Sequence, residues 1–433
     1  MVATDLSTGQ PARVTAGTAG TAGTAGTAGT AGTAEEAFAR LMSPAALADP
    51  YPHFHALRAV APAHRVGTAC FLSRYADCQK VLNDSGLTVQ DPGWHDASSP
   101  GWRDNLATRL MYQSMQSRNN PDHNRLRRLV GGAFAPRRMA DYRALVERLA
   151  PELFGQMADA GSDGTPVDFM AHVAYPLPSA VMGEMLGVPE ADRERFRGIG
   201  ADFFNVLDLV PGTEAAGRAH AAAAAMIEYW SGVIADRRRT PRDDMTTELT
   251  QACDAGVISA EELLGLLVFL FSAGYRTTTA LLGNSTAQLL GHPAEAGRLR
   301  EDPARAAAIV EESLRHEAPS QFVPRLTLMD CVISGCEVPA GTLLISMVGA
   351  ANRDPAQFAD PDLFRPGRPG ERALSFGGGL HYCIGAALSR MEATVVLPLL
   401  FRRFPRLAIG GIPVRHPALR MRIHTRLPVS LSG

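Results

Sequence analysis

The chain has 433 residues, of which 46% are hydrophobic and 20% are charged, and its formal net charge is −2. This balance is typical of a globular protein with one large domain or two smaller ones. Basic residues are offset by acidic ones and form no run longer than Arg237 to Arg239, so we expect no nucleic-acid partner. The six cysteines are few for this length and lack the paired spacing of zinc sites, which indicates a reducing, cytoplasmic location.

Near the N-terminus, the triplet Thr-Ala-Gly repeats from Thr15 to Gly32. Such a tract has almost nothing to bury, so residues 1–34 are predicted to be disordered and residues 35–433 to form a single domain. The N-terminus has no basic start followed by an apolar core, and the longest apolar run, Leu263 to Ala273, is too short to cross a bilayer. We therefore expect neither a signal peptide nor a membrane anchor.

Residues 87–115 differ in composition from the neighbouring helical segments. Pro-Gly pairs at positions 92–93 and 100–101 are predicted to break any long element here. Aromatic and methionine residues are scattered through this stretch, among them Trp94. Long loops in compact domains are often functional, and such side chains suit an adaptable apolar pocket. A packed surface loop is the alternative interpretation.

The stretch from Asn120 to Val130 predicts a basic helix. His123 and Arg127 are four residues apart, so they share one helical face and could both reach a single anionic group. The alternative is an ordinary solvated basic face. From Met139 to about Arg239 the pattern is helical with short breaks.

A long apolar helix is predicted over residues 260–290. Ser259 and Glu262 have the form of a capping box at its start. Apolar residues on nearly all sides place this helix through the centre of the domain. In its middle, the run Ala273-Gly274-Tyr275-Arg276-Thr277 puts small and polar residues where they cost stability, which indicates a functional reason for them.

The following part of the chain turns from helix to strand. Asp302-Pro303 is a good helix start, and Glu312 and Arg315 near the end of that helix predict an ordinary ion pair. A strand-rich part begins at Val323, with residues 335–341 predicted as a hairpin turn and Thr342 to Val348 as a strand.

The stretch from Phe376 to Arg390 reads FGGGLHYCIGAALSR. Its three consecutive glycines predict a tight loop. Good helix formers follow Cys383, so this cysteine lies at or near a helix N-terminus, where the helix dipole favours a thiolate. A thiolate on a glycine loop is a soft metal ligand, and a buried free cysteine is the alternative.

This stretch resembles the haem-binding loop of the cytochrome P450 family, which it matches at Phe376, Gly377, Gly379, His381, Cys383 and Gly385. The resemblance implies a mainly α-helical α+β fold with a small β-rich part, which binds haem b between helix 260–290 and the Cys383 loop. Cys383 would be the axial thiolate ligand of the iron, a ligand that favours O–O cleavage. The other implied haem contacts are Phe376 near the sulfur and His381, His123, Arg127 and Arg325 near the propionates.

The resemblance also implies roles for residues around the haem. A buried structural trio that supports the loop would consist of Glu312, Arg315 and Arg368. The substrate pocket would include Trp94, Ala273, Phe322 and Val323. Gly274 would leave room for dioxygen, and Thr277 matches a threonine that relays protons together with a neighbouring acid.

Arg276 stands where the family has that acid. An arginine cannot act as a carboxylate proton shuttle. Three explanations stay open: Arg276 forms a salt bridge while water and Thr277 deliver protons, it anchors an anionic substrate group, or the enzyme takes its oxygen from peroxide. Fatty-acid peroxygenases of the same superfamily carry an arginine at this site but lack the threonine.

By this resemblance, we expect a soluble bacterial monooxygenase that hydroxylates or epoxidises an apolar small molecule in secondary metabolism. It would use dioxygen and electrons from a ferredoxin and a ferredoxin reductase. One alternative is a peroxide-using or oxidative-coupling enzyme in which Arg276 anchors the substrate. Another is a non-catalytic haem-binding sensor or recruitment module.

Overall fold

The structure is a computed structural model that describes residues 32–204, 213–370 and 372–431. The predicted disordered tail, residues 1–34, lies outside the described residues except for its last three. Thr33 already caps the first helix, because its side chain accepts a hydrogen bond from the Glu36 amide and the Glu36 side chain accepts one from the Thr33 amide.

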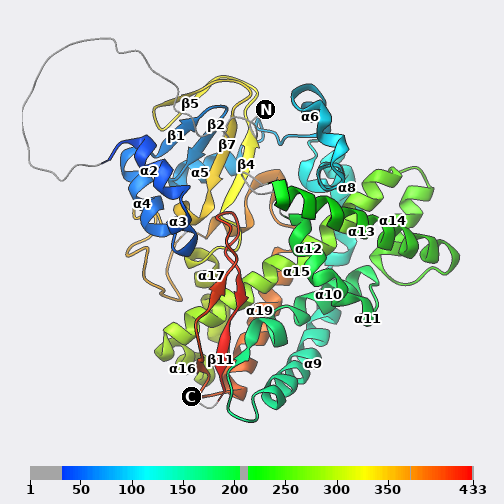
Figure 1. The fold of residues 1–433 in the computed structure, drawn as a ribbon, viewed down its shortest axis with the longest axis vertical. Helices are drawn as coiled ribbons and strands as arrows, with labels where there is room; N and C mark the ends of the chain where they lie inside the picture. The colour runs from blue at the N-terminus through cyan, green and yellow to red at the C-terminus, as the bar shows by residue number, and fades with distance from the viewer. Residues whose placement is uncertain (1–31, 205–212, 371, 432–433) are drawn as a thin grey trace, which may run out of the picture.

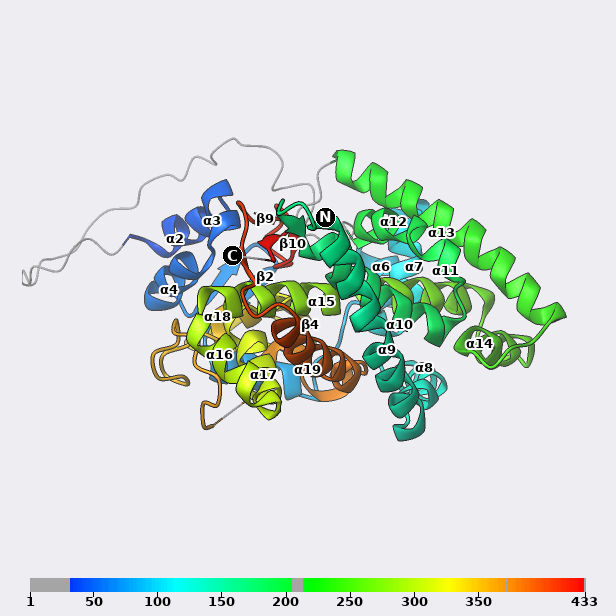
Figure 2. The ribbon, with the colours of Figure 1, turned by 90° about the horizontal axis from the view of Figure 1, so that it is seen from below.

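Helices form most of the described chain, and a small β-rich part lies to one side of them (Figure 1). The helix α15 (Ala260–Gly291) runs across the middle of the molecule (Figure 2). This arrangement confirms the predicted mainly α-helical fold with a small β-rich part.

The helices fall into three groups along the chain. Beside the sheet lie α2 (Ala34–Leu41), α3 (Pro44–Ala48), α4 (Tyr51–Val60) and α5 (Tyr75–Asn83). The main helical part consists of α6 (Pro92–Ser98), α7 (Leu106–Gln113), α8 (Asp122–Gly131), α9 (Pro136–Ala160), α10 (Pro176–Leu186), α11 (Glu190–Arg193), α12 (Arg195–Phe203), α13 (Thr213–Arg239), α14 (Met245–Asp254) and α15. The last group is α16 (Pro293–Glu301), α17 (Ala306–His316), α18 (Val348–Ala351) and α19 (Ala386–Arg403).

The main sheet has the strand order β1 (Ala63–Val66), β2 (Ala69–Leu72), β7 (Leu343–Met347) and β4 (Phe322–Leu326). β2 and β7 are parallel, and the other neighbouring strands are antiparallel. Three small sheets complete the β structure: β5 (Cys331–Ile333) with β6 (Cys336–Val338), β9 (Val414–Arg415) with β10 (His424–Arg426), and β11 (Pro428–Ser430) between β3 (Val167–Asp168) and β8 (Ala408–Ile409).

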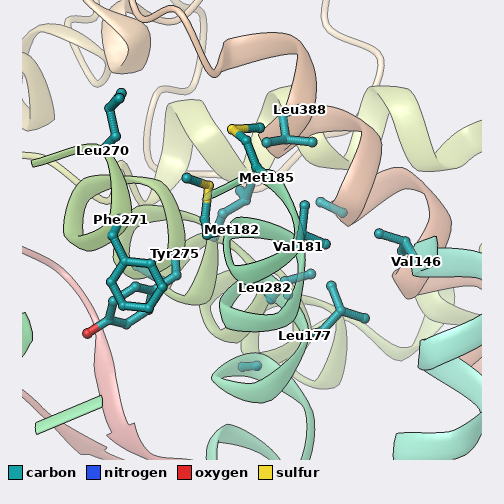
Figure 3. Close-up of a cluster of buried hydrophobic side chains, with 14 of the residues drawn as sticks. Val146, Leu177, Val181, Met182, Met185, Leu270, Phe271, Tyr275, Leu282 and Leu388 are labelled. Carbon is teal, nitrogen blue, oxygen red and sulfur yellow. The ribbon is translucent and has the colours of Figure 1, made fainter. Parts of the chain in front are cut away.

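The central helix α15 is held on several sides by other helices. Its predicted capping box is confirmed, since the Ser259 hydroxyl accepts a hydrogen bond from the Glu262 amide and the Glu262 carboxylate accepts one from the Ser259 amide. Among the described helices, α15 alone has the length and apolarity of a membrane span, but 72% of its most apolar window is buried inside the protein. Met182 of α10 and Leu388 of α19 belong to the same apolar cluster as Leu270 and Leu282 of α15 (Figure 3).

The prediction that the two Pro-Gly pairs prevent a long element is confirmed, since α6 has 7 residues and α7 has 8, but the loop interpretation of this stretch and the extent of one hairpin turn were wrong. Residues 92–113 are largely helical, because Pro92 stands in the first turn of α6, where a missing N–H costs nothing, and Asp91 caps that helix. The hairpin turn lies at Ser334-Gly335, where φ is 49° and 79°, and residues 336–338 form the strand β6. The predicted turn over residues 335–341 was therefore too long.

Candidate active site

A cavity of about 500 Å³ lies between the middle of α15 and the loop around Cys383. Its wall includes many apolar side chains, among them Met115, Met182, Phe269, Leu270, Phe322, Val323 and Ile345. No Asp or Glu of the described residues lines it. The cavity therefore suits an apolar molecule and has an excess of positive charge in its wall.

The loop that carries Cys383 depends on its glycines. Gly377 has a φ of 70° and Gly379 a φ of 60°, a region that L side chains rarely adopt. The Cys383 amide donates a hydrogen bond of 3.0 Å to the Phe376 carbonyl, which closes the loop. Gly385 is the N-cap of α19, so the prediction that Cys383 lies near a helix N-terminus is confirmed.

The thiol of Cys383 is reached from the cavity, whose wall it helps to form. Burial by the surrounding protein raises the pKa of this thiol, whereas the Gly385 N–H and the charges of Arg127 and Arg390 act to lower it. The Arg390 guanidinium also lies 4.4 Å from the ring centroid of Phe376. Without a metal ion the thiol form is therefore favoured, and the Gly385 N–H and the two arginines would support the thiolate that metal binding requires.

Four basic side chains meet in the cavity wall, and they are those predicted to contact haem propionates: His123, Arg127, Arg325 and His381. The rings of His123 and His381 have centroids 4.4 Å apart. Burial, followed by the charges of Arg325, His123 and Arg127, lowers the pKa of His381 to about 3. Burial likewise lowers the pKa of Arg325 to about 10.

These four side chains fit the propionates of a haem. The positive charges of Arg127 and Arg325 disfavour protonation of the two histidines, so an anionic group placed among these side chains would be stabilised. Nδ1 of His123 is buried and has no hydrogen-bond partner among the described residues. Two carboxylates would supply both the negative charge and the missing acceptor, while Cys383 in the same cavity would supply the axial ligand.

The predicted structural trio is in place behind this loop. Arg315 donates hydrogen bonds of 2.8 Å and 2.7 Å to the two carboxylate oxygens of Glu312. Arg368 Nε donates to Glu312 Oε1 at 3.0 Å, and the Arg365 amide donates to the same oxygen at 2.7 Å. Arg315 also reaches the carbonyl of Asn352, so α17 is fixed to the chain that leads into the Cys383 loop.

On the opposite wall, Ala273, Gly274 and Thr277 of α15 all line the cavity. The Thr277 hydroxyl donates a hydrogen bond of 3.0 Å to the Ala273 carbonyl. A Cβ added to Gly274 would lie 2.4 Å from Sδ of Met182. α10 therefore packs closely on α15 around Met182, as Figure 3 shows, and a larger residue at position 274 would require the Met182 side chain to move.

Arg276 lies outside the wall of the cavity. Its side chain is buried, and its guanidinium is 5.6 Å from the ring centroid of Phe204. Its charge, after burial, also contributes to lowering the pKa of His416 to about 4. In this position Arg276 has no direct contact with the cavity. The salt-bridge and peroxide explanations, in which Arg276 does not touch the substrate, therefore fit better than substrate anchoring, which stays a prediction.

The predicted substrate-pocket residues Ala273, Phe322 and Val323 line the cavity, whereas Trp94 does not. The Trp94 ring packs edge-on against His95, with centroids 4.9 Å apart. His95 lines the cavity instead and stacks on Tyr112 at 3.7 Å. Because residues 92–98 form a helix, neighbouring side chains point about 100° apart, and the residue next to the predicted one faces inward.

Sequence reasoning also missed Arg420, which lines the cavity from the C-terminal segment. Residue 420 reaches the cavity through a long-range pairing: the Gln321 amide donates to the Arg420 carbonyl at 2.9 Å. No local motif marks such a residue, since only the pairing of distant segments brings it to the site.

Comparison with known proteins identifies the family. The family model of cytochrome P450 matches residues 69–409. The biotin biosynthesis cytochrome P450 of Bacillus subtilis (strain 168) is 32% identical over 389 residues, which are 89% of this chain and 96% of that protein.

Two solved structures are similar over nearly their whole length. P450BioI in complex with an acyl carrier protein ligated to hexadec-9Z-enoic acid has a TM-score of 0.82 at 31% identity and covers 90% of this chain and 100% of its own. A myxobacterial cytochrome P450 in complex with myristic acid has a TM-score of 0.81 at 34% identity and covers 91% and 99%. The family consists of haem-thiolate enzymes that incorporate oxygen into their substrates. With its fold, its cysteine loop and its cavity, the chain belongs to the cytochrome P450 family.

Proposed function

We propose that the chain is a monooxygenase that hydroxylates or epoxidises an apolar small molecule of bacterial secondary metabolism with dioxygen. The observation that carries this proposal is the shared cavity: Cys383 and Thr277 line the same largely apolar space. The side chains of Cys383, His123, Arg127, Arg325 and His381 would hold the haem. The same cavity would then bind the substrate against α15.

Haem, when bound, supplies the iron that activates dioxygen and the oxidising power to attack an unactivated carbon. The chain's own residues would prepare this chemistry. The apolar wall excludes water and orients the substrate. The Thr277 hydroxyl, held by the Ala273 carbonyl, would present an O–H group at the cavity that can pass protons inward from water.

The proposed electron donor is a ferredoxin, itself reduced by a ferredoxin reductase, in the cytoplasm. A hollow lined by Arg127, Arg128 and Ile384 supports this part of the proposal. Ile384 is the neighbour of Cys383, so the hollow lies directly behind the ligand loop. A basic surface there would attract an acidic electron-transfer protein, and its binding should weaken with salt.

Dioxygen is the proposed oxidant because Thr277 lines the cavity while Arg276 does not. A buried Arg276 beside Phe204 would leave proton delivery to Thr277 and water. The two solved relatives that hold a fatty acid or a fatty acyl chain support a substrate with an extended hydrocarbon part.

The test is turnover of the haem-loaded protein with a ferredoxin, its reductase and isotopically labelled dioxygen. We expect one labelled oxygen atom in the product. Thr277→Ala should lower product formation about a hundredfold, since proton-transfer groups contribute at least that much, whereas Thr277→Ser should keep most of it. Label from water instead of dioxygen, or equal rates in both variants, would contradict the proposal.

A further inference from the structure

The cavity wall holds two polar rings that make no hydrogen bond within the part of the chain that the structure describes. His95 of α6 and Tyr112 of α7 both line the cavity, and their rings are stacked, with centroids 3.7 Å apart and an interplanar angle of 10°. Only 6% of His95 is exposed, yet neither its ring nitrogens nor the Tyr112 hydroxyl is fully enclosed by protein. Buried polar groups are normally paired, so two unpaired ones that open on a cavity indicate a ligand.

Other aromatic side chains hold both rings in place. Trp94 packs edge-on against His95 with centroids 4.9 Å apart. The Trp102 ring lies 5.4 Å from Tyr112 and 6.0 Å from His95. Trp102 Nε1 donates a hydrogen bond of 2.9 Å to the Asp96 carboxylate, which fixes this ring in turn. The two polar groups are therefore positioned before any ligand binds, and little side-chain freedom is lost on binding.

The helix that carries His95 is also tied to the haem side of the cavity. Asp91, the N-cap of α6, accepts hydrogen bonds of 2.9 Å from the Trp94 amide and of 2.9 Å from Nδ2 of Asn119. Asn119 lies three positions before Asp122, where α8 begins, and α8 carries two of the predicted propionate contacts. The position of the His95 ring is therefore fixed relative to the haem side.

Both rings are neutral hydrogen-bond donors. Burial lowers the pKa of His95 to about 4, although Asp91 and Asp96 act to raise it. Burial raises the pKa of Tyr112, so its hydroxyl keeps its proton. A neutral imidazole has one donor nitrogen, and either nitrogen can carry the proton. Because the rings stack at 3.7 Å, the hydroxyl and the nearest imidazole nitrogen are close enough for one oxygen atom to accept from both.

We propose that His95 and Tyr112 bind the carbonyl oxygen of a substrate that is otherwise apolar. This inference rests on the proposed monooxygenase function and specifies its substrate class. A carbonyl oxygen has two lone pairs and no proton to donate, so it matches two adjacent donors. A carboxylate would need a positive partner, and neither ring carries a charge. No Asp or Glu of the described residues lines the cavity, so no carboxylate in that wall competes for the donors.

This carbonyl contact would also select the carbon that is oxidised. With the carbonyl held at His95 and Tyr112, the distance of each carbon from the carbonyl determines which one lies next to Thr277. Molecules of the same shape without a carbonyl would bind through apolar contacts alone and in more than one position.

The test is a spin-state titration of the ferric haem-loaded protein with cyclododecanone and with methylenecyclododecane, in which a methylene group replaces the oxygen. The quantity compared is the dissociation constant of the alkene divided by that of the ketone. We expect Tyr112→Phe and His95→Phe each to lower this ratio about fivefold relative to the wild type, the usual effect of one neutral hydrogen bond. Alkene binding should stay unchanged in both variants.

Tyr142→Phe is the matched control, because Tyr142 is a buried tyrosine outside the wall of this cavity, and it should keep the wild-type ratio. Calorimetric titration with the same two ligands measures binding without the haem spectrum. Each variant must keep the thiolate-type spectrum of the reduced carbon-monoxide complex, which shows that it folds and holds haem. If His95→Phe does not fold, Tyr112→Phe decides alone.

An unchanged ratio in Tyr112→Phe and His95→Phe would overturn the inference, as would an equal fall in Tyr142→Phe or failure of the ketone to bind. Tighter binding of cyclododecanecarboxylic acid than of the ketone to the wild type would also overturn it, because the site would then select an anion. Oxidation of the alkene with a wild-type ratio in every variant would leave the monooxygenase proposal standing and remove only the carbonyl contact. The expected ratios in a protein that incorporates no labelled oxygen would do the reverse.

Discussion

The haem side of the cavity and the substrate side are built in different ways. On the haem side, the ligand loop from Phe376 to Gly385 and the pair His123 and Arg127 are short local patterns with fixed spacing. On the substrate side, Tyr112 and Arg420 line the same cavity although they are more than three hundred positions apart, because distant segments pack together there. The first side is therefore set by local geometry, and the second by the whole fold.

The largest effect is expected from breaking the support of the haem side. Glu312→Gln removes the charge that Arg315 and Arg368 share in a buried site. Uncompensated buried charges typically cost about 3–5 kcal/mol, so the free energy of unfolding should fall by that amount and haem should be lost more readily. Denaturant unfolding of the haem-loaded protein measures the first effect, and transfer of haem to an acceptor protein measures the second.

The control for this variant is Glu147→Gln, which removes an exposed pair with Arg143 at 3.2 Å. It should change stability by less than about 0.5 kcal/mol, because surface ion pairs contribute little. If both variants lose the same stability, the trio would not be the support of the loop.

A second effect is expected on the same side, at Glu392 of α19. This carboxyl is buried, its Oε2 has no hydrogen-bond partner among the described residues, and burial raises its pKa to about 8. A folded-state pKa above the unfolded value means that stability is full at low pH and declines as pH rises from about 4 to about 8. Glu392→Gln removes this decline.

Between pH 5 and pH 8, we therefore expect the free energy of unfolding of the wild type to fall by about 3 kcal/mol relative to that of Glu392→Gln. Denaturant unfolding at a series of pH values measures this. Parallel pH profiles for the two proteins would show that Glu392 is not held in the neutral form.

A smaller effect is expected at the boundary between the two sides, at Gly274. An alanine there would require the Met182 side chain to move, because its Sδ lies 2.4 Å from the position of the added Cβ, so Gly274→Ala should destabilise the protein by about 1 kcal/mol. Met182→Ala should relieve the clash in the double variant. A thermal-unfolding double-mutant cycle measures the coupling.

Gly155 in α9 provides the matched helix glycine, because nothing lies within 4 Å of a Cβ added there. Gly155→Ala should stabilise the protein by about 0.5–1 kcal/mol through helix propensity alone. If Gly274→Ala is equally stabilising, the close contact with Met182 is not a constraint.

The difference between the two sides also explains what the sequence could reveal. The helix 260–290, its capping box and the position of Cys383 follow from periodicity and spacing, and all were confirmed. Trp94 was assigned to the pocket from the family resemblance, but a helical turn directs His95 inward in its place. Arg420 carries no local signal, because its position depends on a pairing with residue 321.

Arg276 shows the same limit within a single helix. Its departure from the family pattern is visible in the sequence, but the side chain's direction is not, and the structure places it against Phe204 and outside the cavity wall. The position of Arg276 along α15 was predictable because the helix fixes it, whereas the residues that pack against Arg276 come from other parts of the chain.

The most direct test of the central claim is the absorption spectrum of the reduced carbon-monoxide complex, compared between the wild-type protein and Cys383→His. We predict that the wild type gives the red-shifted Soret band of thiolate-ligated haem and that Cys383→His gives the band of histidine-ligated haem with unchanged haem content. A thiolate-type band that persists in Cys383→His, or its absence from the wild type, would contradict the assignment of Cys383 as the haem ligand.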